Sequence, residues 1–232
     1  MPDSTTDSVT PLTIVKPSGT PRGGVIVLQE AFGVNEHIVD VCNRIAAAGY
    51  IAVAPHLFHR SGDPKMGYDD LSIIWPHIEA MTMDGTFADI DAAIAALEAE
   101  GIGTAKQGVV GFCLGGTVAF FAGTRRNLGA AVTFYGGGIT GRWFFPSQVD
   151  EAPSLQAPWL GLYGDKDLGI PIDEVEQLRA AAATASVRTE VVRYPEAEHG
   201  FNCDRRPSYN AEAAADGWAR MLAWFDSTIA SA

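Results

Sequence analysis

Short apolar runs alternate along the chain with segments in which apolar residues recur every three or four positions. The runs predict buried strands at residues 25–28, 50–54, 107–110, 130–135, 159–163 and 189–194. Helical spacing follows the first run, with apolar residues at Ile38, Val41, Cys42, Ile45 and Ala46. This alternation predicts an α/β fold, a mostly parallel sheet with helices on both faces. No repeat or linker divides residues 1–232, so we expect a single domain.

Further helices are expected in the later part of the chain. Thr86-Phe-Ala-Asp89 resembles a capping box, which predicts that a helix begins there. Its apolar face would consist of Phe87, Ile90, Ile94 and Leu97. The same spacing predicts helices over about residues 173–184 and around residues 218–225. The intervening turns are rich in glycine and proline.

Residues 56–84 form a long stretch without clear periodicity, and we expect a loop or small cap near a site. The stretch contains His56, His59 and His77. Their spacing does not match that of metal ligands, so solvated or pocket-lining histidines are expected there rather than a metal site.

Composition narrows the possible functions. The hydrophobic fraction of 47% is ordinary, and the net charge of −12 argues against a nucleic-acid or anionic-lipid surface. No apolar run reaches the roughly 18 residues that a membrane-spanning helix needs, and the first residues lack the features of a secretion signal. The three cysteines are odd in number and widely spaced, which predicts neither a disulfide framework nor a zinc site. A cytoplasmic location fits best.

The most informative segment is Gly111-Phe-Cys-Leu-Gly-Gly116, which joins a predicted strand to a predicted helix. This context is typical of a nucleophile elbow, with Cys113 where the pattern G-x-S-x-G has serine. Small flanking residues allow close approach of strand and helix, and the backbone N–H of Leu114 would point towards an oxygen bound near the sulfur. The alternative is a tight turn around a buried cysteine.

Other reactive side chains follow the predicted strands at their carboxyl ends, where ligands gather in such sheets. Glu30 follows the first run, Asp165 and Asp167 follow a later one, and His199 follows the last. The order Cys…Asp…His is that of the α/β-hydrolase triad. A histidine can accept the thiol proton, and a carboxylate can orient the imidazole.

At this point the chain resembles the dienelactone hydrolases, which are cysteine-dependent members of the α/β-hydrolase fold. The resemblance extends from Gly24 to about Phe225. It rests on Val27-Leu-Gln-Glu30-Ala-Phe-Gly-Val-Asn35, Gly111-Phe-Cys-Leu-Gly-Gly116, Gly164-Asp-Lys-Asp167-Leu-Gly-Ile-Pro171 and Glu198-His199-Gly-Phe201. All four segments occur in the family's order, which makes a chance match implausible.

The resemblance implies a role for each matching residue. It places the nucleophile on Cys113, the histidine on His199 and the triad carboxylate on Asp167. Asp165 would then be a turn residue. Glu30 matches the glutamate that takes part in activating the thiol. The backbone N–H groups of Leu114 and Ala31 match the oxyanion hole.

One departure concerns the substrate. The family holds a substrate carboxylate with two arginines, but no arginine occurs here between Arg60 and Arg125. The second position, four residues after the histidine, is Cys203. Arg205 and Arg206 are close but not aligned, and they are the candidate substrate-binding residues.

We therefore expect a hydrolase that cleaves a small-molecule ester or lactone through a cysteinyl acyl-enzyme, without metal or cofactor. Two alternatives stay open, a non-catalytic small-molecule binder and a redox sensor in which Cys113 pairs with Cys203. Cys42, on an apolar helix face, is expected to be a core thiol, and Cys203 to pack or line the pocket. The natural substrate and the oligomeric state do not follow from the sequence.

Overall fold

A seven-stranded sheet forms the centre of the computed structural model, which describes residues 9–142 and 144–230. The strand order is β1-β3-β2-β4-β5-β6-β7. Strands β2 to β7 run parallel, and β1 pairs antiparallel with β3. The strands are β1 (Leu12–Val15), β2 (Gly24–Leu28), β3 (Ile51–Pro55), β4 (Gln107–Phe112), β5 (Ala130–Phe134), β6 (Trp159–Gly164) and β7 (Thr189–Tyr194). The predicted α/β fold is confirmed.

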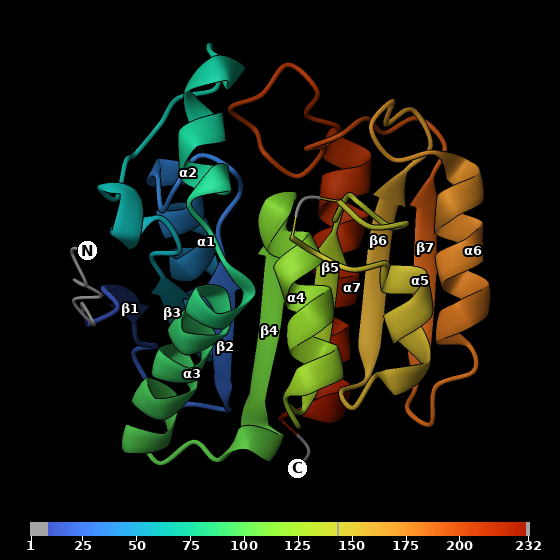
Figure 1. The fold of residues 1–232 in the computed structure, drawn as a ribbon. Helices are drawn as coiled ribbons and strands as arrows, with labels where there is room; N and C mark the ends of the chain where they lie inside the picture. The colour runs from blue at the N-terminus through green and yellow to red at the C-terminus, as the bar shows by residue number, and fades with distance from the viewer. Residues whose placement is uncertain (1–8, 143, 231–232) are drawn as a thin grey trace, which may run out of the picture.

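Helices cover both faces of the sheet (Figure 1). In that view α3 (Met83–Ala99) and α4 (Leu114–Arg125) lie in front, and α1 (Glu36–Ala47) and α7 (Ala211–Thr228) lie behind. The remaining helices are α2 (Trp75–Glu79), α5 (Gln148–Glu151) and α6 (Ile172–Ala182). The apolar stripe predicted for α1 is buried along its whole length, which accounts for its docking on the sheet. No helix in the described part is both long enough and apolar enough to cross a membrane.

The edge strand β1 was not predicted from the sequence. It has only four residues, none of them fully buried, so it lacks the apolar run that identifies the inner strands. Its pairing with β3 decides its conformation, because Leu12 to Val15 lie opposite Pro55 to Ala52. An edge strand of this kind depends on its neighbour more than on its own sequence.

The predicted start of α3 was wrong by one helical turn. Thr82, not Thr86, is the N-cap, and its side chain accepts a hydrogen bond from the Gly85 N–H at 3.1 Å. Thr86 lies inside the helix and is buried. Both threonines are able to cap a helix through the side-chain oxygen, and the capping-box pattern at Thr86 pointed to the later one, which is instead buried within the helix.

Residues 56–82 connect β3 to α3 and form the expected small cap, which includes α2. The His56 and His59 side chains are shielded from solvent and lie against other side chains, contrary to the expectation of solvated or pocket-lining histidines. The His56 ring bonds to Thr13 and Asp63, and the His59 ring bonds to Asp89, with distances of 2.8–3.0 Å. Carboxylates beside them, a fully buried Asp89 and a partly exposed Asp63, give both rings a structural partner, which the sequence spacing did not reveal.

The strand order positions the site. The chain leaves β2 towards one side of the sheet and β4 towards the other, so a crevice opens between their carboxyl ends. Glu30 and Ala31 follow β2, and Cys113 follows β4. The two segments, more than 80 residues apart in sequence, therefore meet at the same point.

Candidate active site

Cys113 occupies a strained turn between β4 and α4. Its backbone has φ 55° and ψ −118°, a conformation that residues other than glycine rarely adopt. The positions two residues to either side of Cys113 must be glycine, because a Cβ atom there would collide with neighbouring backbone atoms. A Cβ on Gly111 would lie 1.8 Å from the Gly115 carbonyl oxygen, and a Cβ on Gly115 would lie 2.3 Å from that of Leu28. The elbow geometry expected from the sequence is thus present, and strain of this kind is concentrated at functional sites.

His199 and Asp167 meet across two loops at the same edge of the sheet. The His199 Nδ1 lies 2.6 Å from the Asp167 Oδ2, and the other carboxylate oxygen accepts the Gly169 N–H at 2.9 Å. Burial lowers the pKa of His199, but the Cys113 sulfur and the Asp167 carboxylate outweigh it and raise this pKa to about 10. The imidazole is therefore held between a carboxylate and the elbow sulfur and is favoured in its protonated form.

Asp165 points to a different partner. Its two carboxylate oxygens accept hydrogen bonds from the Arg193 guanidinium at 2.7 and 2.8 Å. This ion pair fastens the turn after β6 to β7. Both Asp165 oxygens are thus engaged by Arg193, and Asp167 is the carboxylate that the structure brings to the imidazole.

Glu30 lies behind the cavity wall and is completely buried. One of its oxygens accepts a hydrogen bond from the Tyr68 hydroxyl at 2.9 Å, and the other lies 3.3 Å from Arg206 Nη1. Tyr68 was missed by sequence reasoning because it belongs to the aperiodic cap, where a single tyrosine carries no signal. The buried carboxylate thus has two partners from segments far apart in the chain.

The two candidate substrate-binding arginines have different surroundings. Arg206 lines the cavity and forms an ion pair with Glu30. Arg205 projects to the surface, where it pairs with the exposed Glu36 at 2.9 Å, and it does not line the cavity. Of these two arginines, Arg206 is the one in a position to meet a bound molecule.

A cavity of about 720 Å³ opens above the elbow. Cys113, His199 and Asp167 line it together with Leu114 and Ala31. The first backbone N–H of a helix has no acceptor within the helix, so the Leu114 N–H is available at the start of α4. The cap supplies an apolar wall that the sequence did not predict residue by residue, consisting of Leu71, Ile74, Trp75 and Ile78.

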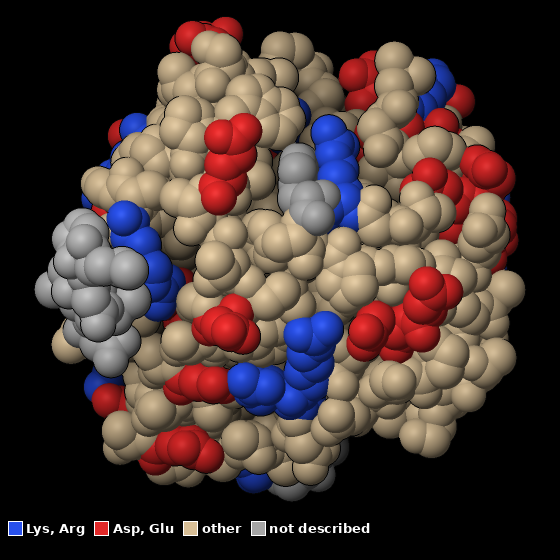
Figure 2. Space-filling model, in the orientation of Figure 1, with Lys and Arg blue, Asp and Glu red and all other residues tan. Residues whose placement is uncertain are grey.

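The charges around this cavity are balanced. Its basic lining residues are Arg142, Lys166 and Arg206. Three carboxylates oppose them, since Asp167 and Glu198 line the cavity and Glu30 pairs with Arg206. On the face of the molecule drawn in Figure 2, basic side chains are likewise scattered among acidic ones. The cavity therefore carries no strong excess of positive charge.

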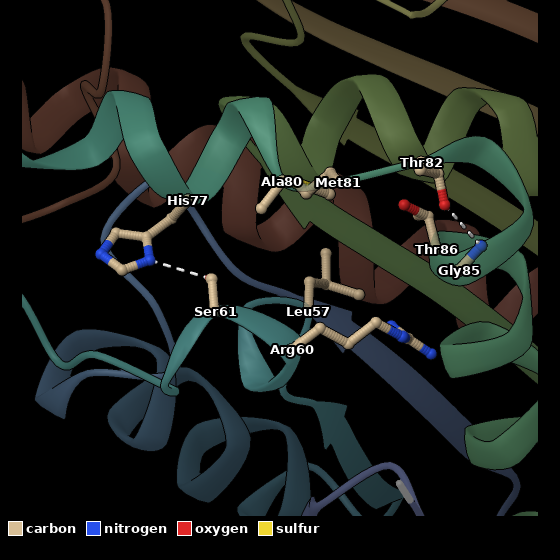
Figure 3. A pocket seen from close by; sticks show the side chains of 9 residues that line it. All are labelled: Leu57, Arg60, Ser61, His77, Ala80, Met81, Thr82, Gly85 and Thr86. Carbon is tan, nitrogen blue, oxygen red and sulfur yellow. Dashed lines mark hydrogen bonds between the residues drawn. The ribbon is translucent and has the colours of Figure 1, made fainter. Parts of the chain in front are cut away.

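A second, smaller cavity lies between the cap and the start of α3 (Figure 3). Its volume is about 10 Å³, room for about one water molecule. His77 Nδ1 lies 2.9 Å from the Ser61 hydroxyl in its wall, and Arg60 crosses its floor. It is too small to hold a substrate, and none of the predicted catalytic residues lines it.

The other two cysteines differ from Cys113. Cys42 is fully buried on α1, and burial raises the pKa of its thiol to about 12. Cys203 is also fully buried, and its thiol donates a hydrogen bond to the Tyr68 oxygen at 3.3 Å. The expectations of a core thiol at position 42 and of packing at position 203 agree with these surroundings.

Comparison with known proteins agrees with this geometry. The sequence pattern of the "Dienelactone hydrolase family" matches residues 12–229. A protein of Escherichia coli strain K12 assigned as a carboxymethylenebutenolidase is 43% identical over 215 residues, which cover 90% of this chain and 79% of that protein. The crystal structure of a Klebsiella pneumoniae protein assigned as a dienelactone hydrolase shares 40% identity with a TM-score of 0.86, and the match covers 93% of this chain and 92% of that one.

A more distant structure shows the same fold. It is that of a dienelactone hydrolase-like promiscuous phosphotriesterase from metagenomic libraries, with 24% identity and a TM-score of 0.74 over 94% of this chain and 98% of that one. The extent of these matches and the strained cysteine elbow lead to one assignment. The chain belongs to the dienelactone hydrolase family of carboxylic ester hydrolases.

Proposed function

We propose that the chain hydrolyses a carboxylic ester or lactone through an acyl-enzyme on Cys113. The observation that carries the proposal is the arrangement of the elbow sulfur, the imidazole of His199 and the carboxylate of Asp167 around one cavity. A protonated imidazole beside the sulfur favours the thiolate, which is the nucleophilic form of cysteine. Neither alternative, a non-catalytic binder or a redox sensor, is favoured by membership of a hydrolase family.

The reaction would proceed in two halves. The Cys113 thiolate attacks the carbonyl carbon, and the N–H groups of Leu114 and Ala31 hold the resulting oxyanion, each worth roughly 3 kcal/mol in such sites. The carbon–oxygen bond then breaks, and His199 gives its proton to the leaving alkoxide. In the second half His199 takes a proton from water, and the hydroxide attacks the thioester. The carbon–sulfur bond then breaks, the acid product leaves, and Cys113 returns as thiolate beside the protonated His199. Asp167 keeps the imidazole oriented throughout.

Glu30 would act on this chemistry through its charge rather than through contact with substrate. Its buried carboxylate lies close enough to Arg206 to fix that side chain in the cavity wall. The Tyr68 hydroxyl neutralises part of the remaining negative charge by hydrogen bonding. We propose that this arrangement sets the electrostatic potential at the Cys113 sulfur before substrate enters.

The cavity favours neutral substrates with an apolar part. A carboxylate in a largely dry pocket needs a charged partner. Two of the three basic residues that line the cavity are already paired, Arg206 with Glu30 and Lys166 with Glu196. The cap wall offers apolar contact instead. We therefore expect aryl or alkyl esters and neutral lactones to be better substrates than a dienelactone that carries a carboxylate.

The acyl-enzyme is tested by mass spectrometry. After brief mixing with an activated aryl ester, intact mass should increase by one acyl group, and peptide mapping should place that group on Cys113. The Cys113→Ala variant should show neither the adduct nor turnover. An adduct on another residue, or full activity in Cys113→Ala, would remove the basis of the proposal.

Substrate charge is tested with matched acid and neutral esters. Arg206→Ala is compared with Arg205→Ala, a control at the surface. We expect a higher kcat/KM for the neutral ester in the unmodified protein, and no change in Arg205→Ala. A preference of a hundredfold or more for the acid, lost in Arg206→Ala, would show that Arg206 leaves Glu30 to bind a substrate carboxylate.

A further inference from the structure

Three potential metal ligands from distant parts of the sequence meet beneath the cavity wall. Glu30 follows β2, His37 lies in the first turn of α1, and Cys203 lies in the loop after β7. Each offers one ligand atom, and these atoms all lie within 4.8 Å of one another. All three side chains are buried, with exposed fractions of 0%, 3% and 0%. Their sequence spacing gave no indication of this cluster.

An unsatisfied nitrogen provides independent evidence for a missing ligand. The His37 Nε2 is buried and has no hydrogen-bond partner among the described residues. Leaving a buried polar atom unpaired costs about 1–3 kcal/mol. The backbone around it is regular, because Asn35 caps α1 through the His37 and Ile38 N–H groups. The imidazole is thus held in place by a well-formed helix while one of its nitrogens lacks a partner.

The separations suit a small cation. With bonds of about 2.0–2.3 Å, neighbouring ligand atoms of tetrahedral zinc lie roughly 3.3–3.7 Å apart. Side-chain shifts of about 1 Å would bring the three atoms from their present spacing to that geometry. Thiolate, imidazole and carboxylate are all ordinary zinc ligands, and the sulfur disfavours magnesium and calcium.

Charge and surroundings support the same ion. A Glu30 carboxylate and a Cys203 thiolate present two negative charges to a divalent cation, with the thiol proton released to solvent, and Arg206 adds one positive charge beside Glu30. Tyr68 already contacts both groups, since its hydroxyl donates to Glu30 and its oxygen accepts from the Cys203 thiol. The bond to Glu30 remains when a metal binds, whereas the bond from Cys203 is lost with the thiol proton. Groups that hold metal ligands in orientation by hydrogen bonds raise affinity. Arg206 contacts one Glu30 oxygen and Tyr68 contacts the other, so a metal would bind through a remaining lone pair of one of these oxygens.

We infer that Glu30, His37 and Cys203 form a zinc-binding site. The site is separate from the sulfur and imidazole of the proposed active site, although it shares Glu30 with that machinery. It does not depend on turnover, and its test therefore uses protein in which Cys113 is replaced by alanine. This background also removes binding by the Cys113–His199 pair, which is the obvious competing site for zinc.

The experiment is a titration of metal-free Cys113→Ala protein with Zn²⁺ and with Co²⁺. We expect one zinc per chain by equilibrium dialysis with elemental analysis. Cobalt should give a sulfur-to-metal charge-transfer band. Adding Cys203→Ser should abolish that band and weaken zinc binding by roughly 100-fold or more, while adding Cys42→Ser should change neither. Circular dichroism establishes that each variant is folded.

A second ligand variant guards against loss of folding in the first. His37→Gln, added to the Cys113→Ala background, should weaken or abolish the cobalt–sulfur band. It should also reduce zinc affinity in the same way as Cys203→Ser. Zinc binding that survives both variants would overturn the inference. So would the absence of one-to-one binding in the Cys113→Ala background, because that result would assign any zinc bound by the unmodified protein to Cys113 and His199.

Discussion

Replacing Asp167 by asparagine tests the proposed triad most directly. The Asp167 carboxylate is almost fully buried and lies 2.6 Å from the His199 Nδ1. The substitution keeps the shape of the side chain but removes its charge. It therefore changes a charge-assisted hydrogen bond to a neutral one at the step where His199 carries a proton.

The expected loss follows from the strength of that bond. A hydrogen bond to a charged group contributes about 1.5–3 kcal/mol. Since 1.36 kcal/mol corresponds to a tenfold change in rate, kcat/KM should fall roughly 10- to 150-fold. Part of the loss would come from misorientation of the imidazole, because the amide is able to donate as well as accept.

Asp165→Asn is the matched control, two residues away. Asp165 pairs with Arg193, and both side chains are partly exposed to solvent. Loss of such a pair costs at most about 1 kcal/mol of stability. It should leave kcat/KM essentially unchanged.

The assay compares kcat/KM of the two variants on one neutral aryl ester, with circular dichroism and thermal melting to establish folding. Equal losses in the two variants would mean that Asp167 acts only through the stability of the loop. A larger loss in Asp165→Asn would move the triad carboxylate to Asp165.

Three further predictions concern the elbow and the thiols. Limited iodoacetamide treatment of metal-free protein should label Cys113 well before Cys42, whose thiol is buried with a pKa of about 12. Peptide mapping measures the order of labelling, and early labelling of Cys42 would contradict the prediction. In Cys113→Ala the pKa of His199 should fall below the value of about 10, because the sulfur that raises it is gone. An unchanged His199 titration, followed by NMR, would be inconsistent with contact between His199 and Cys113. Gly115→Ala should lower the free energy of unfolding by about 1–3 kcal/mol, since the new methyl group would lie 2.3 Å from the Leu28 carbonyl oxygen. An unchanged denaturant unfolding curve would show that the elbow accommodates the methyl group without cost.

The sequence by itself determined the inner strands, the helix that follows Cys113 and the position of the elbow. These features are local, since an apolar run, two closely packed glycines and helical spacing act within about 20 residues. The order of Cys113, Asp167 and His199 along the chain also follows from sequence, because parallel strands bring their carboxyl ends to one edge. This is why the proposed triad was readable before its geometry was known.

Tertiary structure decided everything that depends on the path of a loop. Arg205 and Arg206 are adjacent in sequence, yet one pairs with a surface glutamate and the other reaches Glu30. Tyr68 gained its importance only when the aperiodic cap folded against the loop after β7. Local pattern carries no information on such contacts, because they depend on the direction in which two irregular segments cross.

The same reason explains the errors of prediction and the cluster of potential zinc ligands. The N-cap of α3 at Thr82 and the edge strand β1 were selected by packing and pairing with the sheet. His37 and Cys203 are 166 residues apart, and neither belongs to a recognisable metal motif. Burial of both beside one carboxylate is a property of the assembled fold, in which side chains from separate segments share a space that none of those segments defines alone.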